Sequence, residues 1–84
     1  MVRIKSEYLN LESLKPFGFF DTGMRDFALD PAVENEGHPL AKMFTVLNTF
    51  IQKETGKFWC GFQTDDVVRV LQKLFDAGMV EEVL

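Results

Sequence analysis

The stretch T-D-D-V-V-R-V-L-Q-K-L-F-D-A-G-M, residues 64–79, has the clearest pattern in this chain of 84 residues. Its apolar residues recur at steps of three and four, which is the period of an amphipathic helix. The apolar stripe consists of Val67, Val70, Leu71, Leu74 and Phe75. The pattern predicts a helix over 65–77 and, in the M-V-E-E-V-L that follows, a short strand over 79–84.

Both ends of this predicted helix carry suitable residues. Thr64 is suited to cap the first turn, where a side-chain oxygen can accept a hydrogen bond from a backbone N–H. Gly78 suits the left-handed conformation that closes many helices, and Met79 is then placed to contact Leu74. These local signals make this helix the best-defined element of the sequence.

A second amphipathic helix is predicted over 39–55. Pro39 suits a first helical turn, and Gly56 suits the residue after a last one. The apolar positions are again three and four apart: Leu40, Met43, Phe44, Leu47, Phe50 and Ile51. The following K-F-W-C-G-F predicts a short strand over 57–62, with Phe58, Cys60 and Phe62 on the same side.

The N-terminal part is less regular. Residues 1–9 alternate between apolar and polar side chains, which predicts a strand. Residues 10–38 mix Pro, Gly, Asp and Asn with many phenylalanines, and we expect an ordered but irregular segment. The prediction is a single α+β domain over 1–84, with two principal amphipathic helices packed on a small antiparallel sheet.

The composition narrows the classes of function. The net charge is −4, which disfavours binding to nucleic acid or anionic lipid, because both need clustered Lys and Arg. The chain has one cysteine, Cys60, so no intramolecular disulfide can form. No apolar run approaches the roughly 20 residues of a membrane span, and no signal peptide is apparent. We expect a cytoplasmic protein without membrane contact.

The catalytic motifs that the sequence offers are weak. F-F-D-T-G, residues 19–23, resembles the strand that precedes the catalytic turn of aspartic proteases. That family needs two such carboxylates, and Asp-Thr-Gly is also ordinary turn chemistry, so we interpret Asp21 as a turn residue. Cys60 and His38 could form a nucleophile pair, but neighbouring aromatic residues favour an inert thiol. We therefore predict no enzyme activity, no cofactor and no metal site.

The residues from 64 to 82 also resemble the third helix of a winged-helix domain and the wing strand that follows it. The resemblance implies that Arg69, Gln72 and Lys73 face nucleic acid, as in a DNA-binding transcriptional regulator. The acidic start of the helix, which includes Asp65, opposes an approach to phosphate. Asp65 and Arg69 are also spaced for an i,i+4 ion pair.

The function that we expect is therefore non-enzymatic binding to protein, as an adaptor or an inhibitor of a larger basic partner. Nine phenylalanines are many for a chain of this length, and aromatic residues and Met are enriched at interface centres. Burial of the same rings in the core, or in a homodimer, is the alternative. The predicted partner-binding residues are Phe17, Phe19, Phe20, Met24, Phe27, Asp30, Glu34 and Glu36.

Overall fold

The chain folds as a small α+β structure with two antiparallel sheets. The computed structural model describes residues 2–34, 47–61 and 65–83. The strands are β1 (Val2–Ile4), β2 (Phe19–Asp21), β3 (Asp26–Leu29), β4 (Thr49–Gln52), β5 (Phe58–Cys60) and β6 (Val80–Glu82). The α-helices are α1 (Leu11–Leu14), α2 (Pro31–Glu34) and α3 (Asp65–Asp76), and the 3₁₀ turns are η1 (Ser6–Tyr8) and η2 (Lys15–Phe17).

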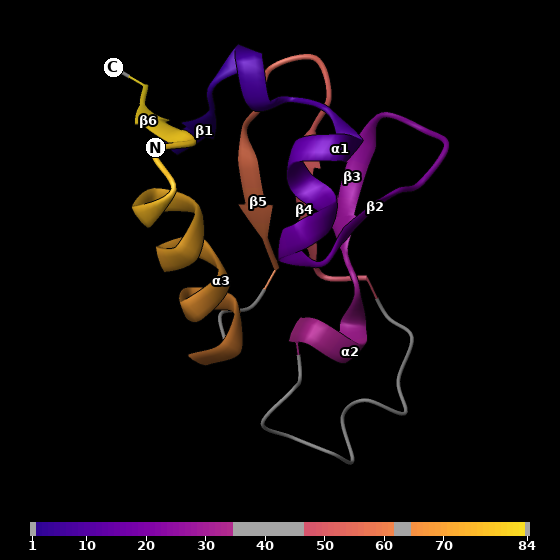
Figure 1. Cartoon of the computed structure of the whole chain (residues 1–84). Coiled ribbons are helices and arrows are strands. Elements are labelled where there is room, and N and C mark those ends of the chain that lie inside the picture. The colour runs from indigo at the N-terminus through magenta and orange to yellow at the C-terminus, as the bar shows by residue number, and fades with distance from the viewer. Residues whose placement is uncertain (1, 35–46, 62–64, 84) are drawn as a thin grey trace.

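The larger sheet has the order β2-β3-β4-β5, so each strand lies antiparallel to its neighbour in the chain. The smaller sheet pairs β1 with β6 and brings the two termini together (Figure 1). A backbone hydrogen bond of 2.7 Å from Ile4 to Gly56 connects β1 with the turn between β4 and β5. The two sheets are thereby joined at one end of the larger sheet.

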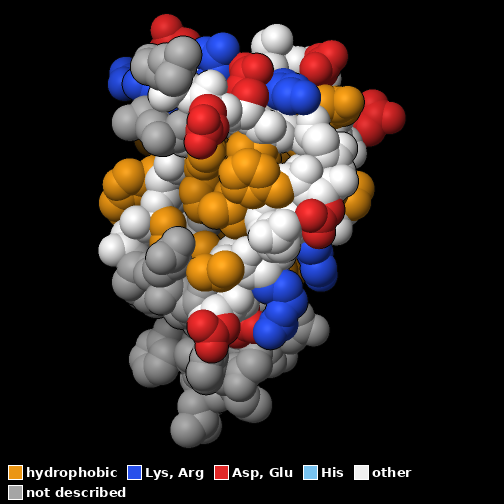
Figure 2. All heavy atoms as spheres, turned by 90° about the vertical axis from the view of Figure 1, so that its left-hand side faces the viewer, with side chains coloured by type: hydrophobic (Ala, Val, Ile, Leu, Met, Phe, Trp, Pro, Cys, Tyr) orange, Lys and Arg blue, Asp and Glu red, His pale blue; other side chains and the backbone are white. Residues whose placement is uncertain are grey.

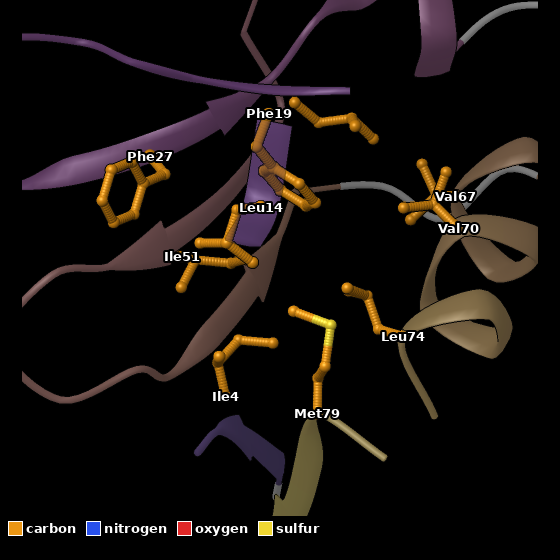
Figure 3. Packing of buried hydrophobic residues seen from close by; sticks show 10 residues of the cluster. Ile4, Leu14, Phe19, Phe27, Ile51, Val67, Val70, Leu74 and Met79 are labelled. Carbon is orange, nitrogen blue, oxygen red and sulfur yellow. The ribbon is translucent and has the colours of Figure 1, made fainter. Parts of the chain in front are cut away.

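The hydrophobic core lies between one face of the four-stranded sheet and the helices. Phe19, Phe27, Leu29 and Ile51 contribute from the sheet, and Val67, Val70 and Leu74 from α3 (Figure 3). Leu14 of α1, Ile4 of β1 and Met79 complete the cluster, and Val33 of α2 packs against it. Each described α-helix therefore contributes to the same side of this sheet.

The described C-terminal part confirms most of the sequence prediction. Helix α3 buries Val67, Val70 and Leu74 of the predicted stripe, whereas Leu71 is half-buried and Phe75 is exposed. The strands β5 and β6 lie within the predicted ranges. Gly78 is left-handed, with a φ of 72°. The N–H of Met79 donates to the carbonyl of Leu74 at 3.1 Å, as in a Schellman motif. The predicted cap Thr64 lies outside the described residues.

The prediction of a helix over 39–55 is wrong in its described part. Residues 49–52 form β4, an inner strand of the sheet, and a turn follows at residues 53–55. The apolar spacing placed Phe50 and Ile51 on one helical face, but the strand sends these two side chains to opposite faces. Pairing with both β3 and β5 outweighs the local helical pattern. Residues 39–46 lie outside the described part of the chain.

The segment over 10–38 is also more regular than predicted. It contains α1, the β2–β3 hairpin and α2, and only its end lies outside the described residues. Asn10 caps α1, since its side-chain oxygen accepts from the N–H of Ser13 at 2.8 Å. The predicted strand over 1–9 is confirmed only for β1, because η1 follows it.

Candidate functional site

The face of the four-stranded sheet that points away from the core carries a row of aromatic side chains. Strand register sets this row, since Phe20 pairs with Ala28, Ala28 with Phe50, and Phe50 with Trp59. Directly paired residues of adjacent strands point to the same face. We call this side the outer face, and its described residues are Phe20, Asp26, Ala28, Phe50, Gln52 and Trp59.

The aromatic rings of the outer face are accessible. Trp59 is 54% exposed and Phe20 is 38% exposed, while Phe50 is half-buried and Ala28 is fully buried. The Phe50 and Trp59 ring centroids are 5.5 Å apart, with the planes tilted by 38°. This tilted packing holds the indole in place while much of its surface remains in water. The row therefore offers a rigid apolar surface across the sheet.

Two adjoining depressions lie on the outer face around Asp26 and Gln52. The smaller has a volume of about 260 Å³ and is lined by Asp26, Phe50, Gln52 and Trp59. The larger, of about 700 Å³, extends from Asp26 and Gln52 to the two hairpin turns, where Met24, Arg25, Lys53 and Glu54 complete its lining. Asp26 and Gln52 line both depressions, so the two lie next to each other.

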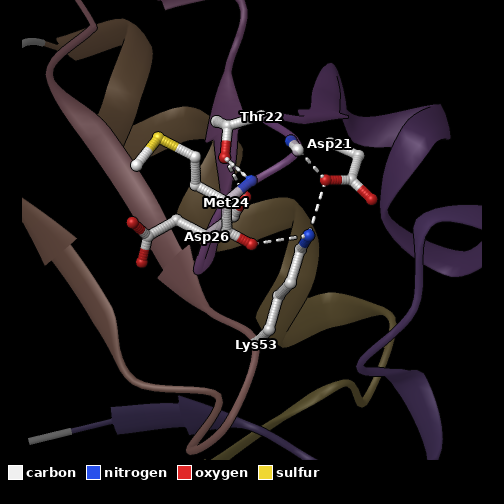
Figure 4. A network of polar contacts seen from close by, with 6 residues as sticks. Asp21, Thr22, Met24, Asp26 and Lys53 are labelled. Atoms are coloured by element: carbon white, nitrogen blue, oxygen red, sulfur yellow. Dashed lines mark hydrogen bonds and ion pairs between the residues drawn. The ribbon is translucent and has the colours of Figure 1, made fainter.

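A polar network holds the two hairpin turns together (Figure 4). The Lys53 ammonium donates to the Asp21 carboxylate at 2.6 Å and to the Met24 carbonyl at 2.9 Å. The Asp21 carboxylate also accepts from the N–H of Gly23 at 2.8 Å, which confirms the predicted Asp-Thr-Gly turn. Both contacts of the Asp21 carboxylate therefore hold the hairpin turns in place.

We expect Asp21→Asn to remove a pH-dependent part of the stability. The hydrogen bond from Lys53, followed by that from Gly23, lowers the pKa of Asp21 below its ordinary value of 3.8. Because the folded-state pKa is the lower one, the contribution is fully present well above 3.8 and is lost as the pH falls through the folded-state value.

The measurement is the Tm of the wild type and of Asp21→Asn between about pH 2 and about pH 7, at low and at high salt. The difference should shrink on acidification and in salt, because both partners are substantially exposed. A difference that stays constant over this range would contradict the assigned contact.

A second apolar surface lies on α3. Val68 and Phe75 are exposed and Leu71 is half-buried, so they form a stripe beside the buried one. Figure 2, which faces the α3 side, shows apolar side chains gathered near the middle of this view and charged side chains above and below them. The stripe consists of apolar side chains alone, which do not define a particular ligand.

The residues of the nucleic-acid alternative lie on the exposed side of α3, but two of them bind within the helix. The Arg69 guanidinium donates to the buried Asp66 carboxylate at 3.1 Å, so the predicted pairing with Asp65 is wrong. Gln72 donates to the Asp76 carboxylate at 2.9 Å, and Lys73 is exposed. The described chain that precedes α3 in the sequence forms the β4–β5 hairpin and not a helix. The winged-helix resemblance is therefore limited to α3 and β6.

The predicted partner-binding residues do not form one surface. Phe19 and Phe27 are buried core residues, and the half-buried Phe17 packs against the core. Phe20 lies on the outer face, and Met24 is 78% exposed in the β2–β3 turn. The other predicted residues are acidic, and the described ones, Asp30 and Glu34, lie beyond the opposite end of β3. Asp30 accepts from the N–H of Ala32 at 2.9 Å, Glu34 ends α2, and Glu36 lies outside the described residues.

Sequence reasoning missed Phe50, Trp59, Asp26 and Gln52. The signal was the alternation in T-F-I-Q and F-W-C, where every second side chain belongs to the outer face. The prediction for K-F-W-C-G-F did place Phe58 and Cys60 on one side, and both pack against the core. Trp59 consequently points the other way.

The remaining site predictions concern Cys60, metal binding and membrane contact. The Cys60 thiol lies 3.6 Å from both the Asn48 amide nitrogen and the Thr49 hydroxyl, while His38 lies outside the described residues. Within residues 2–34, 47–61 and 65–83, no three His, Cys, Asp or Glu side chains are grouped to hold a metal. None of the helices described is long and apolar enough to cross a membrane.

The chain was compared with protein families, curated proteins and solved structures. No family model matches the chain, and neither the curated proteins nor the solved structures contain a match.

Proposed function

We propose that this chain is a non-enzymatic, cytoplasmic protein-interaction module that binds a larger basic protein, as an adaptor or an inhibitor. The observation that carries the proposal is the aromatic row of the outer face. Its side chains are partly exposed, while every described α-helix packs on the opposite side of the sheet. Exposed aromatic residues held on a rigid sheet are typical of the centre of a protein interface.

Interface energetics favour Trp59 as the main anchor. Trp and Tyr are enriched among the residues whose truncation costs more than about 2 kcal/mol in binding. An indole fixed by its contact with Phe50 loses little conformational entropy when a partner covers it. Phe20, at the other end of the row, would extend the same contact across the sheet.

The charge of the chain supports a basic partner. Among the described residues, three basic side chains are already in ion pairs with acids of this chain: Arg3, Lys53 and Arg69. The whole chain has 13 acidic and nine basic residues, which gives a net charge of −4. Such an excess accelerates encounter with a basic protein and opposes a second acidic one.

We expect the double variant Phe20→Thr, Trp59→Thr to lose its partner. Thr suits an exposed strand position, so the fold should persist, while the loss of two aromatic anchors should weaken binding at least about hundredfold. The measurement is capture from a lysate of the natural source with tagged wild type and variant, followed by elution in a salt gradient. Far-UV circular dichroism and an unfolding curve check the fold.

The matched control is Val68→Gln, Phe75→Gln, which removes exposed apolar residues from α3 without changing the charge. Stoichiometric capture of one protein by the wild type and this control, but not by the outer-face variant, supports the proposal. Equal capture by all three, or no captured protein, overturns it. A wild-type dimer in sedimentation that the outer-face variant lacks would assign the surface to a second copy.

The same capture experiment tests the DNA-binding alternative. Nucleic acid retained without a protein, and lost on Arg69→Ala, would favour a winged-helix-like regulator. Two observations weigh against it: the Arg69 guanidinium is bound to Asp66, and the exposed side of α3 also carries Asp65 and Asp76.

A further inference from the structure

The smaller depression of the outer face combines two kinds of lining. Phe50 and Trp59 supply aromatic surface, and Asp26 and Gln52 supply polar groups. Its volume of about 260 Å³ lies below the roughly 300–1,000 Å³ of sites for drug-sized ligands. The size therefore suits one side chain of a partner rather than a free small molecule.

The carboxylate in this lining has no partner within the chain. The described residues provide neither a hydrogen bond nor an ion pair to the Asp26 side chain, whereas its backbone carbonyl accepts from the Thr22 hydroxyl at 2.8 Å. Figure 4 shows the Asp26 carboxylate turned away from the Lys53 ammonium, which is held by Asp21. Asp26 is a half-buried residue, and its carboxylate is left for a cation from outside.

Gln52 is held in place beside it. Its side-chain oxygen accepts from the Thr55 hydroxyl at 2.9 Å, which fixes the amide within the β4–β5 turn. An amide oxygen has two lone pairs, so it can accept one further hydrogen bond. A carboxylate, an amide oxygen and two aromatic rings then line the same small space.

We propose that this depression binds the side chain of an arginine of the basic partner. A guanidinium is planar, stacks on aromatic faces and presents several N–H donors at once. It can lie against Trp59 while it donates to both oxygens of Asp26, and a further N–H can reach Gln52. A lysine ammonium is a compact, strongly hydrated charge and uses this arrangement less fully.

The proposal rests on the proposed function, since it names the partner chemistry that the outer face recognises. Two cations of this chain, Arg25 and Lys53, line the adjoining larger depression. Lys53 is neutralised by Asp21, and Arg25 is exposed without an ion pair in the described residues. Arg25→Gln should therefore strengthen arginine binding by a small factor.

The test uses three blocked pentapeptides, acetyl-Gly-Ser-Xaa-Ser-Gly-amide, in which Xaa is arginine, lysine or norleucine. Trp59 is the one tryptophan of the chain, so its fluorescence reports on the depression directly. Amide chemical shifts locate the contact. We expect saturable binding of the arginine peptide with shifts centred on Asp26, Phe50, Gln52 and Trp59, weaker binding of the lysine peptide, and none of the norleucine peptide.

The decisive variant is Asp26→Asn, which keeps the shape of the side chain and removes its charge. It should weaken binding of the arginine peptide about tenfold, because a charge-assisted bidentate contact becomes a neutral one. Glu82→Gln removes the same charge from the exposed end of β6 and should leave binding unchanged. Equal binding of the arginine and norleucine peptides, equal affinity of Asp26→Asn and wild type, or no saturable binding would overturn the proposal.

These outcomes separate the arginine proposal from the interaction surface itself. If Phe20 and Trp59 prove necessary for capture of the natural partner while Asp26→Asn captures it as the wild type does, the outer face is an interface without an arginine site. If the outer-face double variant also captures normally, both proposals are wrong.

Discussion

Replacement of Leu74 by alanine is expected to lower the free energy of unfolding by about 3 kcal/mol. Leu74 is fully buried in α3 and belongs to the core cluster that joins the helix to the sheet. Alanine removes apolar contacts and leaves a cavity that the rigid sheet cannot fill. A domain of this size has a total stability of roughly 4–12 kcal/mol, so the loss is a large fraction.

Thermal and urea unfolding measure the effect, and for a domain of this size the Tm should fall by roughly 12–24 °C. Phe75→Ala is the matched control, because this larger neighbour is 42% exposed. We expect Phe75→Ala to cost about 1 kcal/mol or less, since surface substitutions far from special contacts have small effects. Equal losses for the two variants would contradict the assigned orientation of α3.

Helix α3 could be predicted because its signals are local. Its apolar period and Gly78 lie within one short stretch, and one helical face decides which residues are buried. Leu74 and Met79 are joined by backbone as well as by core contacts, as the pattern predicted. No distant part of the chain is needed to specify this element.

The four-stranded sheet could be predicted only in part because its strands are specified by pairing. In T-F-I-Q, residues 49–52, the same apolar residues fit a helix or a strand, and only the neighbours β3 and β5 decide between them. The β2–β3 hairpin was not predicted for a similar reason, because its two strands are only three and four residues long.

Prediction of the candidate site also depended on whether residues 49–52 form a helix or a strand. As a helix, the stretch would place Phe50 beside Ile51, and both would be buried. As a strand it sends Ile51 into the core and Phe50 to the outer face, where it contacts Trp59. Phe20 was found from composition, but Asp26 and Gln52 required the register of β3 and β4.

The second large effect is expected for Gly56→Ala, which should lower the free energy of unfolding by about 3 kcal/mol. Gly56 has a φ of 74°, and a Cβ added there would lie 2.5 Å from the carbonyl oxygen of Ile4. That atom is backbone, so β1 would have to move, and the 2.7 Å hydrogen bond from Ile4 to the Gly56 carbonyl would be disturbed. The variant therefore loosens the junction between the two sheets.

Gly23→Ala separates the two causes. Gly23 is also left-handed, with a φ of 78°, but no atom lies within 4 Å of its added Cβ. Only the conformational cost of about 1–2 kcal/mol should remain there. Urea unfolding of both variants measures the difference, and equal losses would mean that the approach of Ile4 to Gly56 contributes nothing. A greater loss for Gly56→Ala would identify this contact as a main support of the turn that joins the strands of Phe50 and Trp59, and hence of the proposed interface.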